Sequence, residues 1–153
     1  MTTPPLPELP NEPLTLVFDG CSTPKNPGGV ALSAYAILGA GDRTVHSDVV
    51  EVCRGERATN NLAEWHAVVA GIRFLHASPW RNKLTIQGDS QLVIRQLNLE
   101  YRCKQPHLIP YRDEAHKLLG EFVWTAQWVN RGLNELPDQM LRDYFDAHVK
   151  HTL

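Results

Sequence analysis

The sequence predicts an α/β fold in which a five-stranded mixed sheet carries helices on both faces. Two observations support this prediction. The chain opens with three segments rich in β-branched and apolar residues, separated by turn residues, and after residue 60 helical and strand-like segments alternate. The expected order of elements is βββαβααβα. At 153 residues, with no low-complexity linker, residues 14–153 are expected to form one domain. Five prolines within residues 1–13 favour an extended, flexible tail.

The first three strands are expected at residues 14–19, 31–38 and 44–53. Residues 14–19 alternate apolar and mixed positions and end at Asp19-Gly20, a turn-like pair. The second and third segments are rich in Val, Ile, Leu and Tyr, and Gly39-Ala40-Gly41-Asp42 between them has the composition of a turn. We therefore expect an antiparallel meander.

The remaining elements follow from a change of period. Apolar residues recur at spacings of three and four between residues 61 and 77, which predicts an amphipathic helix. A strand is expected at 83–87, a helix at 90–97, a helix at 111–122, a strand at 123–129 and a last helix from Asn134 to about residue 148. Trp65 and Trp128 fall at apolar positions of this pattern, so we expect both in the core.

Four carboxylates stand where these predicted elements begin or end. Asp19 and Asp89 follow strands, and Glu64 and Asp138 lie in the first turns of helices. Because sheets of this type bind ligands at the carboxyl ends of their strands, the four side chains are expected to converge. Carboxylate oxygens are the hard ligands that Mg²⁺ prefers. The sequence therefore predicts an acidic metal site.

Each carboxylate also has a simpler explanation when it is taken alone. Asp19-Gly20 fits a tight turn, and Glu64 three residues after Asn61 fits a capping box. Asp89 fits a helix cap, and Asp138 fits the positive end of a helix dipole. These readings do not explain why all four acids fall at sheet-end positions in this order.

Each of the four acids lies in a short local sequence, and the four segments follow one another along the chain. They read Phe18-Asp19-Gly20, then Thr59-Asn60-Asn61-Leu62-Ala63-Glu64, then Gly88-Asp89-Ser90-Gln91, then Asn134-Glu135-Leu136-Pro137-Asp138. From about Leu14 to about Tyr144 the chain resembles ribonuclease H type 1. The resemblance implies a ribonuclease H-like fold and an endonuclease that cuts the RNA strand of RNA/DNA hybrids, leaving 5′-phosphate and 3′-hydroxyl ends. It implies two Mg²⁺ ions, or Mn²⁺, held by Asp19, Glu64, Asp89 and Asp138.

The same resemblance implies a set of substrate contacts. Glu64 would also contact the ribose 2′-hydroxyl at the cut, and Thr59 would help to hold a phosphate of the DNA strand. The remaining substrate-binding candidates are Asn26, Asn60, Asn61, Gln91 and Arg131. The chain differs from many relatives in two respects. The loop before Asp138 has no histidine, and Arg131 is its only fixed positive charge. Residues 100–117 lack a long basic handle, so we expect weaker, salt-sensitive hybrid binding.

Composition restricts the class of protein. A net charge of −2 argues against a general basic field for nucleic acid but leaves room for a local site. No apolar run reaches the roughly 20 residues that cross a bilayer, and the three cysteines form no CxxC pair. We expect a cytoplasmic monomer that needs no membrane and no obligate protein partner. Two alternatives remain open: another nuclease of the same fold, such as a resolvase or exonuclease, and a non-cleaving hybrid-binding module.

Overall fold

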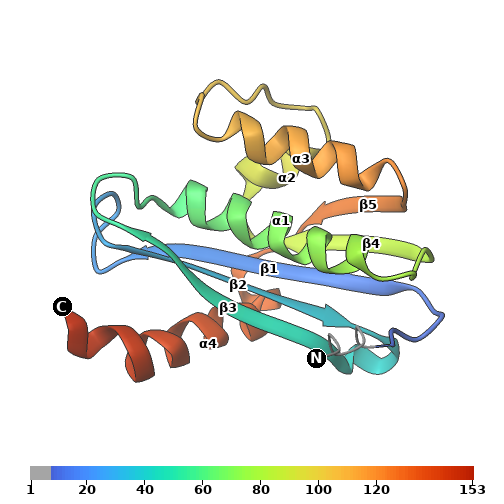
Figure 1. Cartoon of the computed structure of the whole chain (residues 1–153), viewed down its shortest axis with the longest axis horizontal. Coiled ribbons are helices and arrows are strands. Elements are labelled where there is room, and N and C mark those ends of the chain that lie inside the picture. Colours follow the sequence, from blue (N-terminus) through green and yellow to red (C-terminus); the bar gives the residue numbers. More distant parts are fainter. Residues whose placement is uncertain (1–7) are drawn as a thin grey trace, which may run out of the picture.

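The computed structural model describes residues 8–153 and has a five-stranded mixed sheet (Figure 1). Across the sheet the strand order is β3-β2-β1-β4-β5, so β1 is central. The first three strands pair antiparallel, whereas β4 runs parallel to β1 and β5 parallel to β4. The strands are β1 (Leu14–Thr23), β2 (Val30–Leu38), β3 (Thr44–Arg54), β4 (Lys83–Gly88) and β5 (Val123–Trp128).

Helices cover both faces of this sheet, as the sequence predicts. Three of them lie on one face: α1 (Asn60–Ala77), α2 (Gln91–Leu97) and α3 (Ile109–Leu119). On the opposite face α4 (Glu135–Tyr144) packs against β1 and β2 (Figure 1). A π-helical turn (Phe145–Val149) and a 3₁₀ turn (Lys150–Thr152) continue α4 to the end of the chain. Within residues 8–153 no helix has the length and apolar character needed to cross a membrane.

The two largest hydrophobic cores hold these layers together. The larger lies between the sheet and α1, where Leu16, Phe18, Trp65 and Ile86 are almost completely buried. The indole N–H of Trp65 donates to the Gln96 side chain at 2.8 Å, so the buried tryptophan has no unpaired donor. The smaller core joins β2 to α4 and the π-helical turn, through residues Val30, Leu32, Ala34, Leu141 and Val149. This second core fixes the position of α4.

The structure differs from the sequence prediction at two places near the end of a strand. The strand β1 continues past Asp19 to Thr23, because Gly20 pairs with Ser33 of β2 and Thr23 pairs with Val30. Asp19-Gly20 is therefore not a turn. The prediction of a buried Trp128 was also wrong: the residue is 46% exposed, because β5 is an edge strand that α4 does not cover.

The N-terminal segment contacts the domain from Leu9 onward. Leu9 is partly buried against the larger core, and the backbone carbonyl of Glu12 accepts a hydrogen bond from the Trp80 indole at 2.9 Å. The part of the expected flexible tail that precedes residue 8 lies outside the described residues. The described part of the predicted tail is therefore anchored to the fold.

Candidate active site

Asp19 and Asp89 stand side by side where two parallel strands separate. The last paired residues of β1 and β4 are Phe18 and Gly88, and each is followed directly by one of the two aspartates. Beyond this point β1 continues alongside β2, while the chain after β4 turns into α2 at Ser90. The divergence leaves both carboxylates at the carboxyl end of the parallel pair, which is the usual ligand position in such sheets.

Glu64 reaches the same place because the first turns of α1 lie directly on β1. A Cβ atom on Gly20 would overlap the backbone of Ala63 and Glu64, so only glycine permits this close approach. The Ser33 hydroxyl also donates to the Ala63 carbonyl at 2.6 Å, which ties the helix to β2. As a result, carboxylate oxygens of Asp19, Glu64 and Asp89 all lie within 4.8 Å of one another. We call these three residues the acidic triad.

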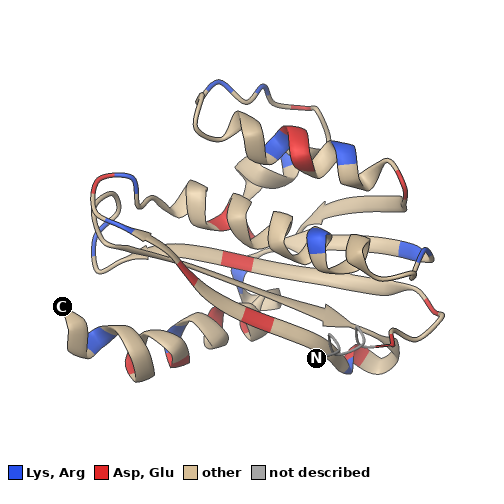
Figure 2. Cartoon of the chain, in the orientation of Figure 1, with Lys and Arg blue, Asp and Glu red and all other residues tan. Residues whose placement is uncertain are grey.

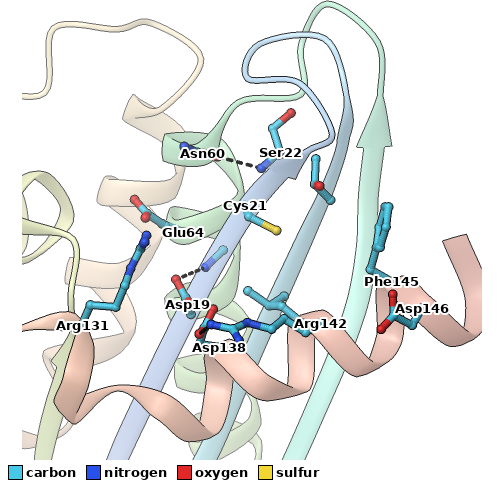
Figure 3. Close-up of a pocket in the computed structure, with 13 residues that line it drawn as sticks. Asp19, Cys21, Ser22, Asn60, Glu64, Arg131, Asp138, Arg142, Phe145 and Asp146 are labelled. Atoms are coloured by element: carbon cyan, nitrogen blue, oxygen red, sulfur yellow. Dashed lines mark hydrogen bonds and ion pairs between the residues drawn. The ribbon is translucent and has the colours of Figure 1, made fainter. Parts of the chain in front are cut away.

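Asp138 lies on the other side of the same cavity but outside the triad. The cavity has a volume of about 450 Å³, and its lining includes Asp19, Glu64 and Asp138 (Figure 3). Asp138 is in the first turn of α4, on the face of the sheet opposite to α1. Its Oδ2 accepts a hydrogen bond from Arg142, one helical turn later, at 2.6 Å. The structure thus brings Asp19, Glu64 and Asp138 to one cavity, and Asp89 lies beside Asp19 and Glu64 in the triad.

Crowding of the acids makes their charged forms costly. Burial, and then the neighbouring charges of Asp89 and Asp138, raise the pKa of Asp19 to about 7. Burial, followed by the charges of Asp19 and Asp89, raises the pKa of Glu64 to about 8. The pKa of Asp89 is also raised, mainly by burial, although Arg131 opposes the change. A cation bound between these carboxylates would stabilise their charged forms.

Two further side chains adjoin Asp89. The guanidinium of Arg131 lies 3.7 Å from the Asp89 carboxylate and is 87% exposed, so the ion pair is loose. The Trp128 indole donates to the backbone carbonyl of Asp89 at 3.1 Å. The sequence periodicity predicted Trp128 in the core, and no feature of the sequence predicted its hydrogen bond to Asp89.

Cys21 is next to the triad on β1, in surroundings that disfavour its thiolate form. Burial, followed by the charges of Asp19, Asp138 and Glu64, raises the pKa of its thiol to about 11. The thiolate form that would be reactive is therefore disfavoured at neutral pH. Arg142 and Phe145 also line the cavity and were not among the predicted site residues. For Arg142, the i,i+4 spacing from Asp138 was the available sequence signal.

Three of the substrate-binding candidates surround the start of α1. The side-chain carbonyl of Asn26 accepts the Asn60 backbone N–H at 3.1 Å, and the side-chain carbonyl of Asn60 accepts the Ser22 N–H at 2.8 Å. Thr59 is the N-cap, and its hydroxyl oxygen accepts the Leu62 N–H at 3.1 Å. These contacts fix the loop after β1 against the helix.

Three of the simpler explanations for the acids do not describe the structure, whereas Asp138 does lie in the first turn of α4, at the positive end of the helix dipole. Because Thr59 caps α1, neither Asn60 nor Asn61 is its cap, and Glu64 is not part of a capping box. Ser90, not Asp89, caps α2 by accepting the Val93 N–H at 3.2 Å. Asn134 precedes α4 but makes no capping bond; its amide donates to the Phe18 carbonyl at 2.9 Å instead.

Comparison with known proteins identifies the family. Residues 20–142 match the family described as reverse transcriptase-like. The chain belongs to this family. Ribonuclease HI of Halobacterium salinarum is 33% identical over 131 residues, which are 84% of this chain and 62% of that protein. The chain therefore spans less than two thirds of the curated relative's length.

Solved structures assign this member of the reverse transcriptase-like family to the ribonuclease H type 1 fold. The N-terminal RNase H domain of Rv2228c from Mycobacterium tuberculosis has a TM-score of 0.81 at 25% identity, covering 93% of this chain and 99% of that one. RNase H1 of Halobacterium salinarum has a TM-score of 0.74 at 29% identity, covering 86% and 98%. LC11-RNase H1, solved in complex with an RNA/DNA hybrid, has a TM-score of 0.70 at 22% identity, covering 84% and 99%, and shows the fold alone.

This member is a short form of the fold. Between α2 and α3, residues 98–108 contain no regular element, so no basic helical handle is present among the described residues. Figure 2 shows the Lys and Arg positions of residues 8–153 spread over loops, strands and several helices. The positive charge available to a polyanion is therefore distributed and local.

Proposed function

We propose that this domain is a ribonuclease H that hydrolyses the RNA strand of RNA/DNA hybrids to 5′-phosphate and 3′-hydroxyl products. The observation that carries the proposal is the acidic triad, with carboxylate oxygens of Asp19, Glu64 and Asp89 within 4.8 Å of one another. Support comes from the family match and from relatives that are named ribonucleases H. The binding of a hybrid by LC11-RNase H1 supports the choice of substrate.

The residues present fit a pair of Mg²⁺ or Mn²⁺ ions. The donors are hard carboxylate oxygens. Burial first, and then the neighbouring carboxylates, raise the pKa values of Asp19 and Glu64, so a bound cation would stabilise their charged forms. Asp19, Glu64 and Asp89 would hold one ion, and Asp138 would complete the set for a second. When bound, two such ions activate a water molecule and stabilise the leaving oxygen of a phosphodiester.

The surrounding side chains would bind and orient the hybrid. Asn26 and Asn60 use their carbonyl oxygens within the protein, and their amide N–H groups can donate to base edges and sugars. Thr59 uses its oxygen as an acceptor and keeps its hydroxyl hydrogen for a DNA-strand phosphate. Asn61, Gln91 and the exposed Arg131 complete the proposed substrate contacts. Glu64 would accept the ribose 2′-hydroxyl, which distinguishes RNA from DNA.

Cleavage of labelled substrates tests the proposal. The full chain is incubated in Mg²⁺ with an RNA/DNA hybrid, single-stranded RNA, duplex RNA or duplex DNA, each with and without chelator. We expect cutting of the RNA strand of the hybrid alone, abolished by chelator. The Asp89→Asn variant should be folded and inactive, whereas Asp113→Asn, an exposed carboxylate on α3, should keep full activity.

Other outcomes would select an alternative. Hybrid binding without cleavage in Mg²⁺ or Mn²⁺ would favour the non-cleaving module, and cutting of duplex DNA would favour a resolvase or an exonuclease. Cytoplasmic localisation and the monomeric state remain predictions from the sequence.

A further inference from the structure

Asp138 differs from the other three carboxylates because it forms a close ion pair with Arg142, one turn later on its own helix. Asp138 Oδ2 lies 2.6 Å from the Arg142 guanidinium, while carboxylate oxygens of the triad lie within 4.8 Å of one another. Figure 3 shows Asp138 and Arg142 together on α4, beneath Asp19 and facing the same cavity. The charge of Asp138 still contributes to the raised pKa of Asp19, so the two carboxylates interact across the cavity.

We propose that Arg142 is a positioning residue: its guanidinium binds the Asp138 carboxylate in the metal-free protein and competes with divalent cations for it. The inference rests on the proposed function, because it assumes that the cavity takes metal ions. In the metal-free protein the guanidinium neutralises Asp138. An ion that binds Asp138 competes with the guanidinium for the carboxylate and lies near a fixed positive charge. Arg142 therefore lowers the affinity of the site for the ion that needs Asp138.

The pair contributes little to the stability of the fold, which makes this role testable. Arg142 is 66% exposed, and its partner lies one turn earlier on the same helix. Exposed pairs of this spacing are weak, because solvent screens them. The position of α4 is set by the buried Leu141, which packs against β2 within the smaller core. Replacement of Arg142 thus leaves the helix in place and alters the carboxylate alone.

Isothermal titration calorimetry with MnCl₂ in the absence of substrate tests the proposal. The proteins are the wild type, Arg142→Met, Arg142→Lys and the control Arg112→Met. Met removes the charge and the donors while keeping the unbranched chain. Arg112 also pairs with a carboxylate, Asp113 at 2.8 Å, but lies on α3, across the sheet from α4. The control therefore removes the same net charge at a distance from the cavity.

We expect Arg142→Met to tighten Mn²⁺ binding about three- to tenfold, from the loss of one competing exposed pair and one nearby positive charge. Arg142→Lys should lie close to the wild type, and Arg112→Met should match it. The melting temperature of each metal-free variant should stay within about 2 °C of the wild type. In cleavage assays, the Mn²⁺ concentration for half-maximal rate should fall in parallel for Arg142→Met.

The results separate this inference from the proposed function. If the wild type binds Mn²⁺ and Arg142→Met binds it equally or more weakly, the competition by Arg142 is refuted while the metal site stands. A tightening of equal size in Arg112→Met would also refute it, since the effect would then follow net charge alone. If the folded wild type binds no Mn²⁺, the metal site fails and the inference fails with it.

Discussion

Substitution of Asp19 by asparagine should stabilise the metal-free protein at alkaline pH. The pKa of Asp19 is raised from an ordinary 3.8 to about 7, so the folded state holds its proton more tightly than the unfolded state does. The contribution of protonated Asp19 to the free energy of unfolding is therefore fully present below about pH 4 and is lost as pH rises through about 7. At 1.36 kcal/mol per pKa unit, the difference between the two pKa values corresponds to a loss of at most about 4 kcal/mol in the free energy of unfolding. Because neighbouring groups and water relax around the charge, we expect a gain of about 1–3 kcal/mol at pH 8.

Urea denaturation followed by tryptophan fluorescence, in chelator, measures this gain. Asparagine keeps the hydrogen bond that the Asp19 side chain accepts from the Gly20 N–H at 2.9 Å, so the local backbone should not change. The gain should be present at pH 8 and should almost vanish at pH 4. The exposed control Asp113→Asn should show no such pH dependence. An Asp19→Asn protein no more stable than the wild type at pH 8, or equally stabilised at both pH values, would refute the reasoning.

Three other predictions concern the same region. Gly20→Ala should prevent stable folding or lower the free energy of unfolding by at least about 3 kcal/mol, because the methyl group would overlap the backbone of α1. The control Gly132→Ala, whose methyl group meets only ordinary contacts, should be nearly neutral in the same urea assay. Asn134→Ala should cost about 1–3 kcal/mol in thermal unfolding, because it leaves the buried Phe18 carbonyl without its donor. Saturating Mg²⁺ should raise the melting temperature of the wild type by several degrees, since about 2.7 kcal/mol is gained at 100 times the Kd; an unchanged melting temperature would contradict ion binding.

Much of the fold could be predicted because local pattern and tertiary environment agree. The spacing of Leu62, Trp65, Val69, Ile72 and Leu75 predicted α1, and each of these side chains is buried in the larger core. The change from alternating to helical period also separated the strands from the helices correctly. The confirmed βββαβααβα order follows from these signals.

The errors arose where a long-range contact decides the outcome. Asp19-Gly20 has the local composition of a turn, yet pairing with β2 extends the strand through it. Trp128 fits an apolar period, yet its strand is at the edge of the sheet and its face is uncovered. Asn134 is a good capping residue, yet its amide binds the Phe18 carbonyl across the fold. None of these partners is near in sequence, so periodicity and propensity contain no information about them.

Convergence of the acids was predictable, but their unequal arrangement was not. The topology required Asp19 and Asp89 to be adjacent, because both follow neighbouring parallel strands, and the glycine contact of α1 adds Glu64. Asp138 depends on α4, which reaches the cavity from the opposite face through a separate core. Its distance from the triad is set by this packing and by Arg142, neither of which the motif around Asp138 specifies.

The charge balance of the cavity relates these details to the binding of a polyanion. Its lining contains four acidic side chains, Asp19, Glu64, Asp138 and Asp146, and two basic ones, Arg131 and Arg142. Both arginines are strongly exposed and pair with a carboxylate, Arg131 loosely with Asp89 and Arg142 closely with Asp138, so each offers phosphate only a partly neutralised charge. A nucleic-acid backbone therefore meets net negative charge until divalent ions bind. We expect ions that neutralise the acids to weaken both ion pairs, which leaves the arginines available to the phosphates. Metal binding and substrate binding should consequently reinforce each other at this site. Arg131 and Arg142 would then both contact phosphates.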